Sequence, residues 1–196
     1  MRILHLSDTH SKHHLLKNLP KADLIIHSGD ATEDGTENEV LDFLNWFCDL
    51  DYRYKIFVAG NHDFCLDGKQ IEGLPENCHY LCYSGIEIEE MKFWGIPYFL
   101  SNELNGDVTQ LMAKTPKETD VLITHRPPYG VLDFEENTNF GCLDLLQTVQ
   151  KICPKYHLFG HVHASYGIEK SQHTIFVNAS LVRKNKIVHK PFLLEI

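Results

Sequence analysis

Histidine and aspartate residues recur in this sequence at the ends of short apolar runs. Asp8 and His10 follow one such run, and His161 and His163 follow another, each pair separated by a single residue. That spacing directs both side chains of a pair to the same side of an extended chain. Carboxylate oxygen and imidazole nitrogen are ligands for Mn²⁺, Fe and Zn²⁺. The two pairs therefore indicate a metal site.

Three further apolar runs end in side chains of the same kind. The candidate residues across all five runs are Asp8, His10, Asp30, Asn61, His62, His125, His161 and His163. One ion takes about four to six ligands, so a set of this size predicts two ions that share a carboxylate. Asp30 suits the shared position, because the preceding Gly29 permits close approach of the backbone. Taken singly, each of these residues has a simpler interpretation as a cap or a satisfied polar group.

The runs that precede these side chains are short and nearly continuous in apolarity, which is typical of strands buried on both faces. Strands are predicted at residues 3–6, 23–27, 55–59, 121–123 and 156–159. The carboxyl ends of parallel strands meet at one edge of a sheet, where ligands bind. The polar side chains are therefore expected to converge although they lie far apart in sequence.

Helical patterns lie between the predicted strands. Apolar residues at three- and four-residue steps predict helices over residues 37–50 and 142–153, and a shorter helix is expected over 13–19. Residues 79–99 alternate as strands do, and residues 174–196 are expected to form two or three more strands, broken near Lys184 and Asn185. This order predicts an α/β fold in which two packed sheets are flanked by helices.

Composition narrows the function classes. A length of 196 residues suits one domain, and we interpret residues 1–196 as such. The chain carries 18 Lys and Arg against 27 Asp and Glu, a net charge of −9, so we do not expect it to bind long nucleic acid. No apolar run approaches the ~20 residues of a membrane span. The N-terminus lacks the pattern of a signal peptide. A cytoplasmic location with six reduced cysteines is therefore expected.

The ordered set of motifs resembles the calcineurin-like metallophosphoesterase family. It comprises Asp8-x-His10, Gly29-Asp30, Gly60-Asn61-His62-Asp63, His125 and Gly160-His161-x-His163. Other segments are similar to the metallophosphoesterase-domain-containing group, namely residues 7–11, 124–128, 141–142, 166–167 and 178–180. The resemblance implies a four-layer α/β/β/α sandwich, with two mixed β-sheets between helical layers and a dinuclear metal centre at one edge.

The resemblance also implies roles for individual residues. Asp8, His10, Asp30 and His163 would hold the first metal, and Asp30, Asn61, His125 and His161 the second. Mn²⁺ is the expected metal, with Fe, Zn²⁺ or Ni²⁺ as alternatives. His62 matches the substrate-facing histidine of the family, and an imidazole there is a candidate general acid for the departing alkoxide.

Several assignments stay open at this point. Asp63 either orients His62 or supports the ligands from behind. Arg126 either contacts a substrate phosphate or forms a structural pair. His13 and His14 are expected to be solvated, the alternative being that they line the entrance near His10.

The expected function is metal-dependent hydrolysis of a small phosphodiester, with cyclic nucleotides among the candidates. Alternatives are a phosphomonoesterase or nuclease that uses the same site, or a non-catalytic scaffold on this fold. Residues 31–35 lack the arginine with which the protein Ser/Thr phosphatase branch grips phosphate, which disfavours phosphoprotein substrates. The expected partner is a small phosphoester, with no membrane contact. The sequence does not indicate an oligomeric state.

Overall fold

The computed structural model describes residues 1–196, whose strands form two large β-sheets. The first sheet has the strand order β15-β1-β2-β3-β4. Strands β1 to β4 run parallel, and β15 lies antiparallel to β1 at one edge. The bounds are β1 (Arg2–Leu6), β2 (Leu24–His27), β3 (Tyr54–Phe57), β4 (Cys78–Tyr80) and β15 (Phe192–Glu195).

The second sheet has the order β11-β12-β10-β7-β6-β5, with four parallel strands inside and an antiparallel strand at each edge. Its strands are β5 (Ser84–Ile88), β6 (Met91–Ile96), β7 (Val121–Thr124), β10 (Tyr156–Phe159), β11 (Gly167–Lys170) and β12 (Ile175–Asn178). Two small hairpins join β8 (Phe134–Glu135) to β9 (Thr138–Asn139) and β13 (Val182–Arg183) to β14 (Lys186–Ile187).

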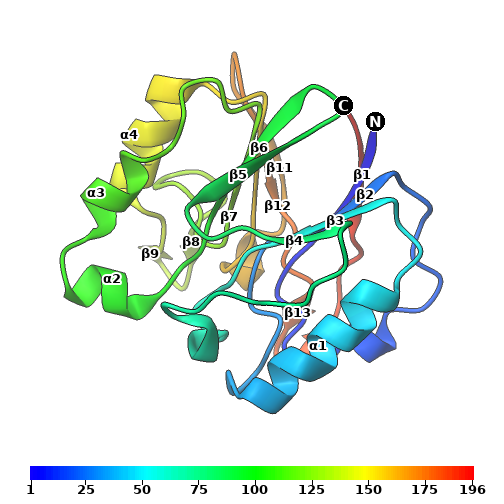
Figure 1. The fold of residues 1–196 in the computed structure, drawn as a ribbon. Helices are drawn as coiled ribbons and strands as arrows, with labels where there is room; N and C mark the ends of the chain where they lie inside the picture. Colours follow the sequence, from blue (N-terminus) through cyan, green and yellow to red (C-terminus); the bar gives the residue numbers. More distant parts are fainter.

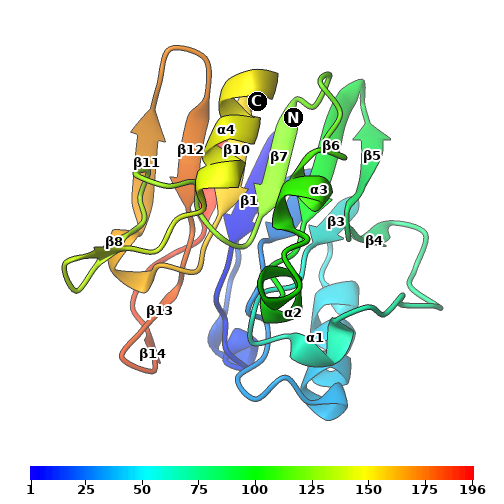
Figure 2. The same ribbon diagram turned by 90° about the vertical axis from the view of Figure 1, so that its left-hand side faces the viewer.

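Helices cover the outer faces of both sheets (Figure 1). Helix α1 (Glu37–Asp49) covers the first sheet, while α2 (Leu100–Leu104), α3 (Val108–Met112) and α4 (Leu143–Ile152) lie over the second (Figure 2). Short 3₁₀ turns occur at η1 (His13–Leu15), η2 (Phe64–Leu66) and η3 (His163–Ser165). The predicted fold, a sandwich of two mixed sheets between helical layers, is confirmed. None of the helices combines the length and apolarity needed to cross a membrane.

Alternate residues of each central strand enter different layers of the core. In β2, Leu24 and Ile26 pack between the two sheets, whereas Ile25 packs toward α1. In β7, Ile123 packs between the sheets and Leu122 packs toward α4. A strand with apolar neighbours on both faces needs apolar residues at every position, because its side chains alternate. This explains why the runs that precede the polar site residues are nearly continuous in apolarity.

The secondary structure agrees with the sequence where the pattern is long or deeply buried. The five predicted strands and the two main helices are present. The helix expected over residues 13–19 is only the single turn η1, since Pro20 follows closely. Residues 174–196 contain four strands rather than two or three, because the turn at Lys184 and Asn185 joins β13 to β14 in an extra hairpin.

Phe43 links α1 to the first sheet, and its truncation tests this packing. Its side chain is 1% exposed and its ring stacks on Phe47 at 5.2 Å. We expect Phe43→Ala to lower the free energy of unfolding by about 3–5 kcal/mol, because the cavity cannot fully collapse. Leu41→Ala, on the exposed side of α1, is the control and should change stability by less than about 0.5 kcal/mol. Chemical denaturation measures both, and similar losses would contradict this packing.

Candidate metal centre

The candidate ligands come from loops at the carboxyl ends of five parallel strands. Strands β1, β2 and β3 supply them from the first sheet, and β7 and β10 supply them from the second. The residues lie after β1 (Asp8, His10), β2 (Asp30), β3 (Asn61, His62), β7 (His125) and β10 (His161, His163). The structure brings the charged and imidazole groups of this set into a few overlapping clusters.

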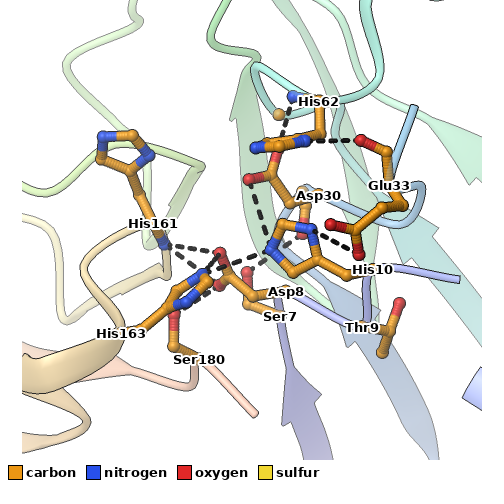
Figure 3. A network of polar contacts seen from close by, with 12 residues as sticks. Ser7, Asp8, Thr9, His10, Asp30, Glu33, His62, His161, His163 and Ser180 are labelled. Atoms are coloured by element: carbon orange, nitrogen blue, oxygen red, sulfur yellow. Dashed lines mark hydrogen bonds and ion pairs between the residues drawn. The ribbon is translucent and has the colours of Figure 1, made fainter. Parts of the chain in front are cut away.

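One cluster contains Asp8, His10 and His163 (Figure 3). The Nε2 atom of His163 lies 3.2 Å from Oδ1 of Asp8 and 3.2 Å from Nε2 of His10. Asp8 and His10 are almost fully buried. Two imidazole nitrogens and a carboxylate oxygen that face one another at these distances form a donor set for a divalent cation.

A second cluster contains Asp30, His125 and His161, and a third joins Asp30 to His10 and His62. The Oδ2 atom of Asp30 lies 3.2 Å from Nε2 of His125 and 3.8 Å from Nε2 of His10. Asp30 thus lies between the imidazoles that follow β1 and those that follow the strands of the second sheet.

The donor atoms are left without protein partners in a way that fits a metal. Nε2 of His125, Nδ1 of His10 and Oδ1 of Asn61 are buried and make no hydrogen bond. Buried polar atoms are normally paired, so each of these calls for a ligand. Nδ1 of His125 donates to the carbonyl of Ser28 at 2.9 Å, and since a carbonyl only accepts, the lone pair of the neutral ring is on Nε2. Nε2 points toward Asp30, as required for a shared cation.

The backbone at the site adopts conformations that L-residues rarely occupy. The φ angles of Asp8, Asp30 and His161 are 54°, 53° and 72°. Such backbone conformations are energetically unfavourable and persist only where the surrounding structure holds them, often at functional sites. Here these conformations direct the three side chains toward the edge where the two sheets meet.

Two glycines allow the main chain to approach the carboxylates. A Cβ atom at Gly160 would lie 2.1 Å from Oδ2 of Asp8, and one at Gly60 would lie 2.2 Å from Oδ1 of Asp30. Neither distance is tolerable for a real side chain. These positions therefore require glycine because of close approach.

Burial and neighbouring charges shift the pKa values of several residues at the site. Burial alone would lower the pKa of His125, but the carboxylate of Asp30 outweighs it and raises the pKa to about 9. Burial would raise the pKa of Asp8, but the hydrogen bond from His163 and the nearby His125 hold it well below its usual range. Burial, followed by the repulsion of His125, lowers the pKa of His161 to about 3. Without a metal, the site thus combines anionic carboxylates with a charged imidazole at His125 and a neutral one at His161.

Residues outside the predicted set hold Asp8 in place. The hydroxyl of Ser180 donates to Oδ2 of Asp8 at 2.6 Å, and the backbone N–H of His161 donates to both carboxylate oxygens at 3.0 and 3.1 Å. The side chain of Asn178 donates to the carbonyl of Val162 at 2.9 Å, between the two histidines that follow β10. Ser180 was not predicted as a site residue, because a single serine two residues after β12 carries no spacing signal.

Asp63 binds backbone rather than the ring of His62. Its carboxylate accepts from the N–H of Gly60 at 2.8 Å, and from the N–H and hydroxyl of Thr32 at 2.9 and 2.8 Å. Burial and the charge of Asp30 raise the pKa of Asp63 to about 6, although these hydrogen bonds oppose the shift. Asp63 therefore ties the loop after β3 to the loop after β2.

His62 is only partly buried. Its Nδ1 donates to the carbonyl of Glu33 at 2.6 Å, and its backbone N–H donates to Oδ1 of Asp30 at 2.8 Å (Figure 3). Its ring meets that of His10 edge to face, with centroids 4.7 Å apart. Because the Glu33 carbonyl accepts at Nδ1, Nε2 is the atom that remains available to a substrate.

Arg126 is engaged by protein groups on three sides. Its guanidinium pairs with Glu103, its Nε donates to the carbonyl of Phe140 at 2.8 Å, and it lies 5.2 Å from the ring centroid of Tyr98. The ring of Tyr98 also stacks near His125, with centroids 6.3 Å apart. Arg126 and Tyr98 thus form a wall beside the histidines from the second sheet.

The fold and the site define a calcineurin-like phosphoesterase. The family model of that description matches residues 1–165, and the chain belongs to the family. It is therefore a metal-dependent phosphoester hydrolase.

Two longer relatives, each matched by the whole of this chain, support the assignment. The chain is 33% identical over 220 residues to a UPF0046 protein of Caenorhabditis elegans, covering 100% of this chain and 75% of the relative. It is 32% identical over 231 residues to metallophosphoesterase domain-containing protein 1 of Homo sapiens, covering 100% and 71%.

Solved structures with low identity share the fold. One chain matches with a TM-score of 0.62 at 15% identity, over 90% of this chain and 89% of the other. The structure of GAP50, described as the anchor in the inner membrane complex of Plasmodium, matches with a TM-score of 0.53 at 14% identity, over 98% and 77%. At this identity the likeness concerns the fold alone.

The raised pKa of His125 predicts how stability depends on pH in the metal-free protein. The folded-state pKa of about 9 exceeds the unfolded value of 6.5, so the charged ring stabilises the fold fully below pH 6.5. We expect the free energy of unfolding in chelator to fall as pH rises from 6.5 to 9, and His125→Gln to reduce this fall. Denaturant titrations across that range measure it. The same decline in both proteins would show that His125 is not its source.

Proposed function

We propose that this chain hydrolyses small phosphodiesters at a paired divalent-metal centre. The observation that carries the proposal is the position of Asp30, whose carboxylate belongs both to the cluster with His10 and to the cluster with His125 and His161. A shared carboxylate suits two cations held side by side. The first cation is assigned to Asp8, His10, Asp30 and His163, and the second to Asp30, Asn61, His125 and His161.

The donor set favours Mn²⁺, with Fe, Zn²⁺ and Ni²⁺ as alternatives, because it combines carboxylate, amide and imidazole without thiolate. Divalent cations there supply Lewis acidity to the phosphoryl group and make water nucleophilic near neutral pH. The protein's part is to hold the ligands in place. Ser180 and the N–H of His161 fix the carboxylate of Asp8, and the N–H of His62 fixes that of Asp30.

His62 is assigned as the proton donor to the leaving group. The carbonyl of Glu33 fixes its ring through Nδ1, so Nε2 remains free to face the departing oxygen of a substrate. A departing alkoxide needs a proton, and an imidazole supplies one near neutral pH. His62 is a catalytic residue in this assignment.

Asp63 and Arg126 have different roles in this proposal. Asp63 is a positioning residue, since its hydrogen bonds go to Gly60 and Thr32 in the loops that carry the ligands. Arg126 directly follows His125, and it contacts a substrate phosphate only if its guanidinium leaves Glu103. In its position beside Tyr98, Arg126 lines the proposed substrate site.

The substrate assignment rests on charge. A net charge of −9 disfavours long polyanions, whereas a small diester carries a single negative charge. Cyclic nucleotides are the first natural diesters to test. A phosphomonoester or an oligonucleotide as the preferred substrate is the competing outcome of the same assay.

Removal of metal should abolish activity. We expect chelated, desalted protein not to hydrolyse bis-p-nitrophenyl phosphate, and added Mn²⁺ to restore the reaction, since the chain's own residues supply no Lewis acid. Absorbance of released nitrophenolate measures the rate. Asp30→Asn tests the shared carboxylate and should also lose activity, because it removes the charge while keeping the side chain's shape. Full activity in chelator, or in Asp30→Asn, would contradict the paired centre.

Replacement of His62 should slow the reaction according to the leaving group. We expect His62→Ala to lower kcat by about 10²–10⁴-fold on a diester with an alkoxide leaving group, because the general acid is lost. A nitrophenolate leaves without a proton, so the loss on bis-p-nitrophenyl phosphate should be much smaller. His173→Ala, at an exposed histidine of the loop after β11, is the control. Equal losses on both substrates would exclude His62 as the proton donor.

A further inference from the structure

A group of potential metal ligands lies where η1 meets α1, and it shares no residue with the centre described above. His13 and His14 on η1 face Asp42 on α1, and the three ligand atoms lie within 4.8 Å of one another. Nε2 of His14 is 2.9 Å from Oδ2 of Asp42, and Nε2 of His13 is 3.2 Å from the same oxygen. We call these three residues the α1 cluster. In Figure 1 the blue turn of η1 lies beside α1.

His13 is the unusual member of the α1 cluster. The sequence predicted that His13 and His14 are both solvated, but the His13 side chain is 0% exposed while that of His14 is 56% exposed. Both ring nitrogens of His13 lack a hydrogen-bond partner, although Nε2 points at Asp42. A buried polar atom without a partner is destabilising, and native proteins rarely retain one. A ligand bound beside Asp42 would give Nε2, one of these two atoms, a partner.

The surroundings of His13 keep its ring neutral and fixed. Burial, reinforced by repulsion from His14, lowers the pKa of His13 to about 4, against the attraction of Asp42. The ring packs against Trp46 and Phe43 with centroids 5.0 and 5.8 Å away. A neutral, immobilised imidazole binds a cation without first losing a proton or rotamer freedom.

The donor set selects the kind of cation. Two imidazoles and one carboxylate suit Zn²⁺, and also Cu²⁺ or Ni²⁺, whereas Mg²⁺ and Ca²⁺ prefer oxygen ligands. His14 and Asp42 are more than half exposed, so a cation reaches the cluster from solvent and keeps a position open to water.

We propose that His13, His14 and Asp42 form a second, mononuclear site that binds Zn²⁺. The site fastens the segment that follows Asp8 and His10 to helix α1. The hydroxyl of Ser11, in the same segment, already donates to Glu39 of α1 at 2.8 Å. The proposal is independent of the phosphoesterase chemistry, since it shares no residue with the metal centre assigned to that reaction.

Zinc binding to Mn²⁺-loaded protein tests the site. Wild type and the variants Asp42→Asn, His14→Ala and His173→Ala are titrated with Zn²⁺ in a calorimeter, and their metal content is measured after dialysis. Wild type and His173→Ala should bind one Zn²⁺ per chain more than the other two. At the least, Asp42→Asn and His14→Ala should bind it more than about tenfold more weakly, because even the loss of a supporting residue weakens metal binding by about 10–100-fold. Both altered side chains are exposed, so these variants should fold.

Tryptophan fluorescence provides an independent measurement at the same place. Cu²⁺ is the probe, because it binds imidazole sites and quenches a nearby indole, and the ring of Trp46 lies 5.0 Å from that of His13. We expect Cu²⁺ to quench wild type and His173→Ala but not Asp42→Asn, and Trp46→Phe to remove the quenched signal. Equal zinc content in all four titrated proteins, or equal quenching in wild type and Asp42→Asn, would overturn the proposal.

Discussion

The structure depends on bringing two buried carboxylates, Asp8 and Asp30, to the edge where its two sheets meet. Without compensation the burial of two like charges would be strongly unfavourable. Each carboxylate accepts hydrogen bonds from backbone and faces imidazoles from the opposite sheet. Because the N–H of His161 crosses from the second sheet to Asp8 of the first, the charges at the site also fix how the sheets are aligned.

The same constraint explains the strained backbone around the site. The chain leaves its strands in left-handed conformations at Asp8, Asp30 and His161, and it passes close to the carboxylates at Gly60 and Gly160. Such local strain persists because the strands before it are buried on both faces and hold the loops rigidly. Stability generated in the core thus maintains a donor arrangement that would be unfavourable by itself. Rigid ligand loops in turn need little reorganisation when a cation binds.

Sequence reasoning predicts the central strands and their convergent ends because one physical signal, apolar runs that end in polar side chains, reports both. It misses α2, α3 and the β8–β9 hairpin, whose short segments lie half-exposed at the periphery and have no long period. Contacts between residues far apart in sequence also cannot be predicted from the sequence pattern: Asp63 binds Thr32, and Arg126 binds Glu103. His13 and His14 are neighbours in sequence, yet tight packing against Trp46 buries only the first.

The charges around the site imply that cation and phosphoester bind together. Two cationic side chains beside its loops are already paired, Arg126 with Glu103, and Lys12 with Glu33 at 3.0 Å. Neither offers an unopposed positive charge to a phosphate, and the carboxylates Asp8 and Asp30 repel one. The attraction for an anionic substrate therefore comes mainly from the metal that the family requires. Since linkage is reciprocal, a bound phosphoester must also tighten the hold on the metal. In a fold of net negative charge, the metal is thus the main source of local affinity for an anion.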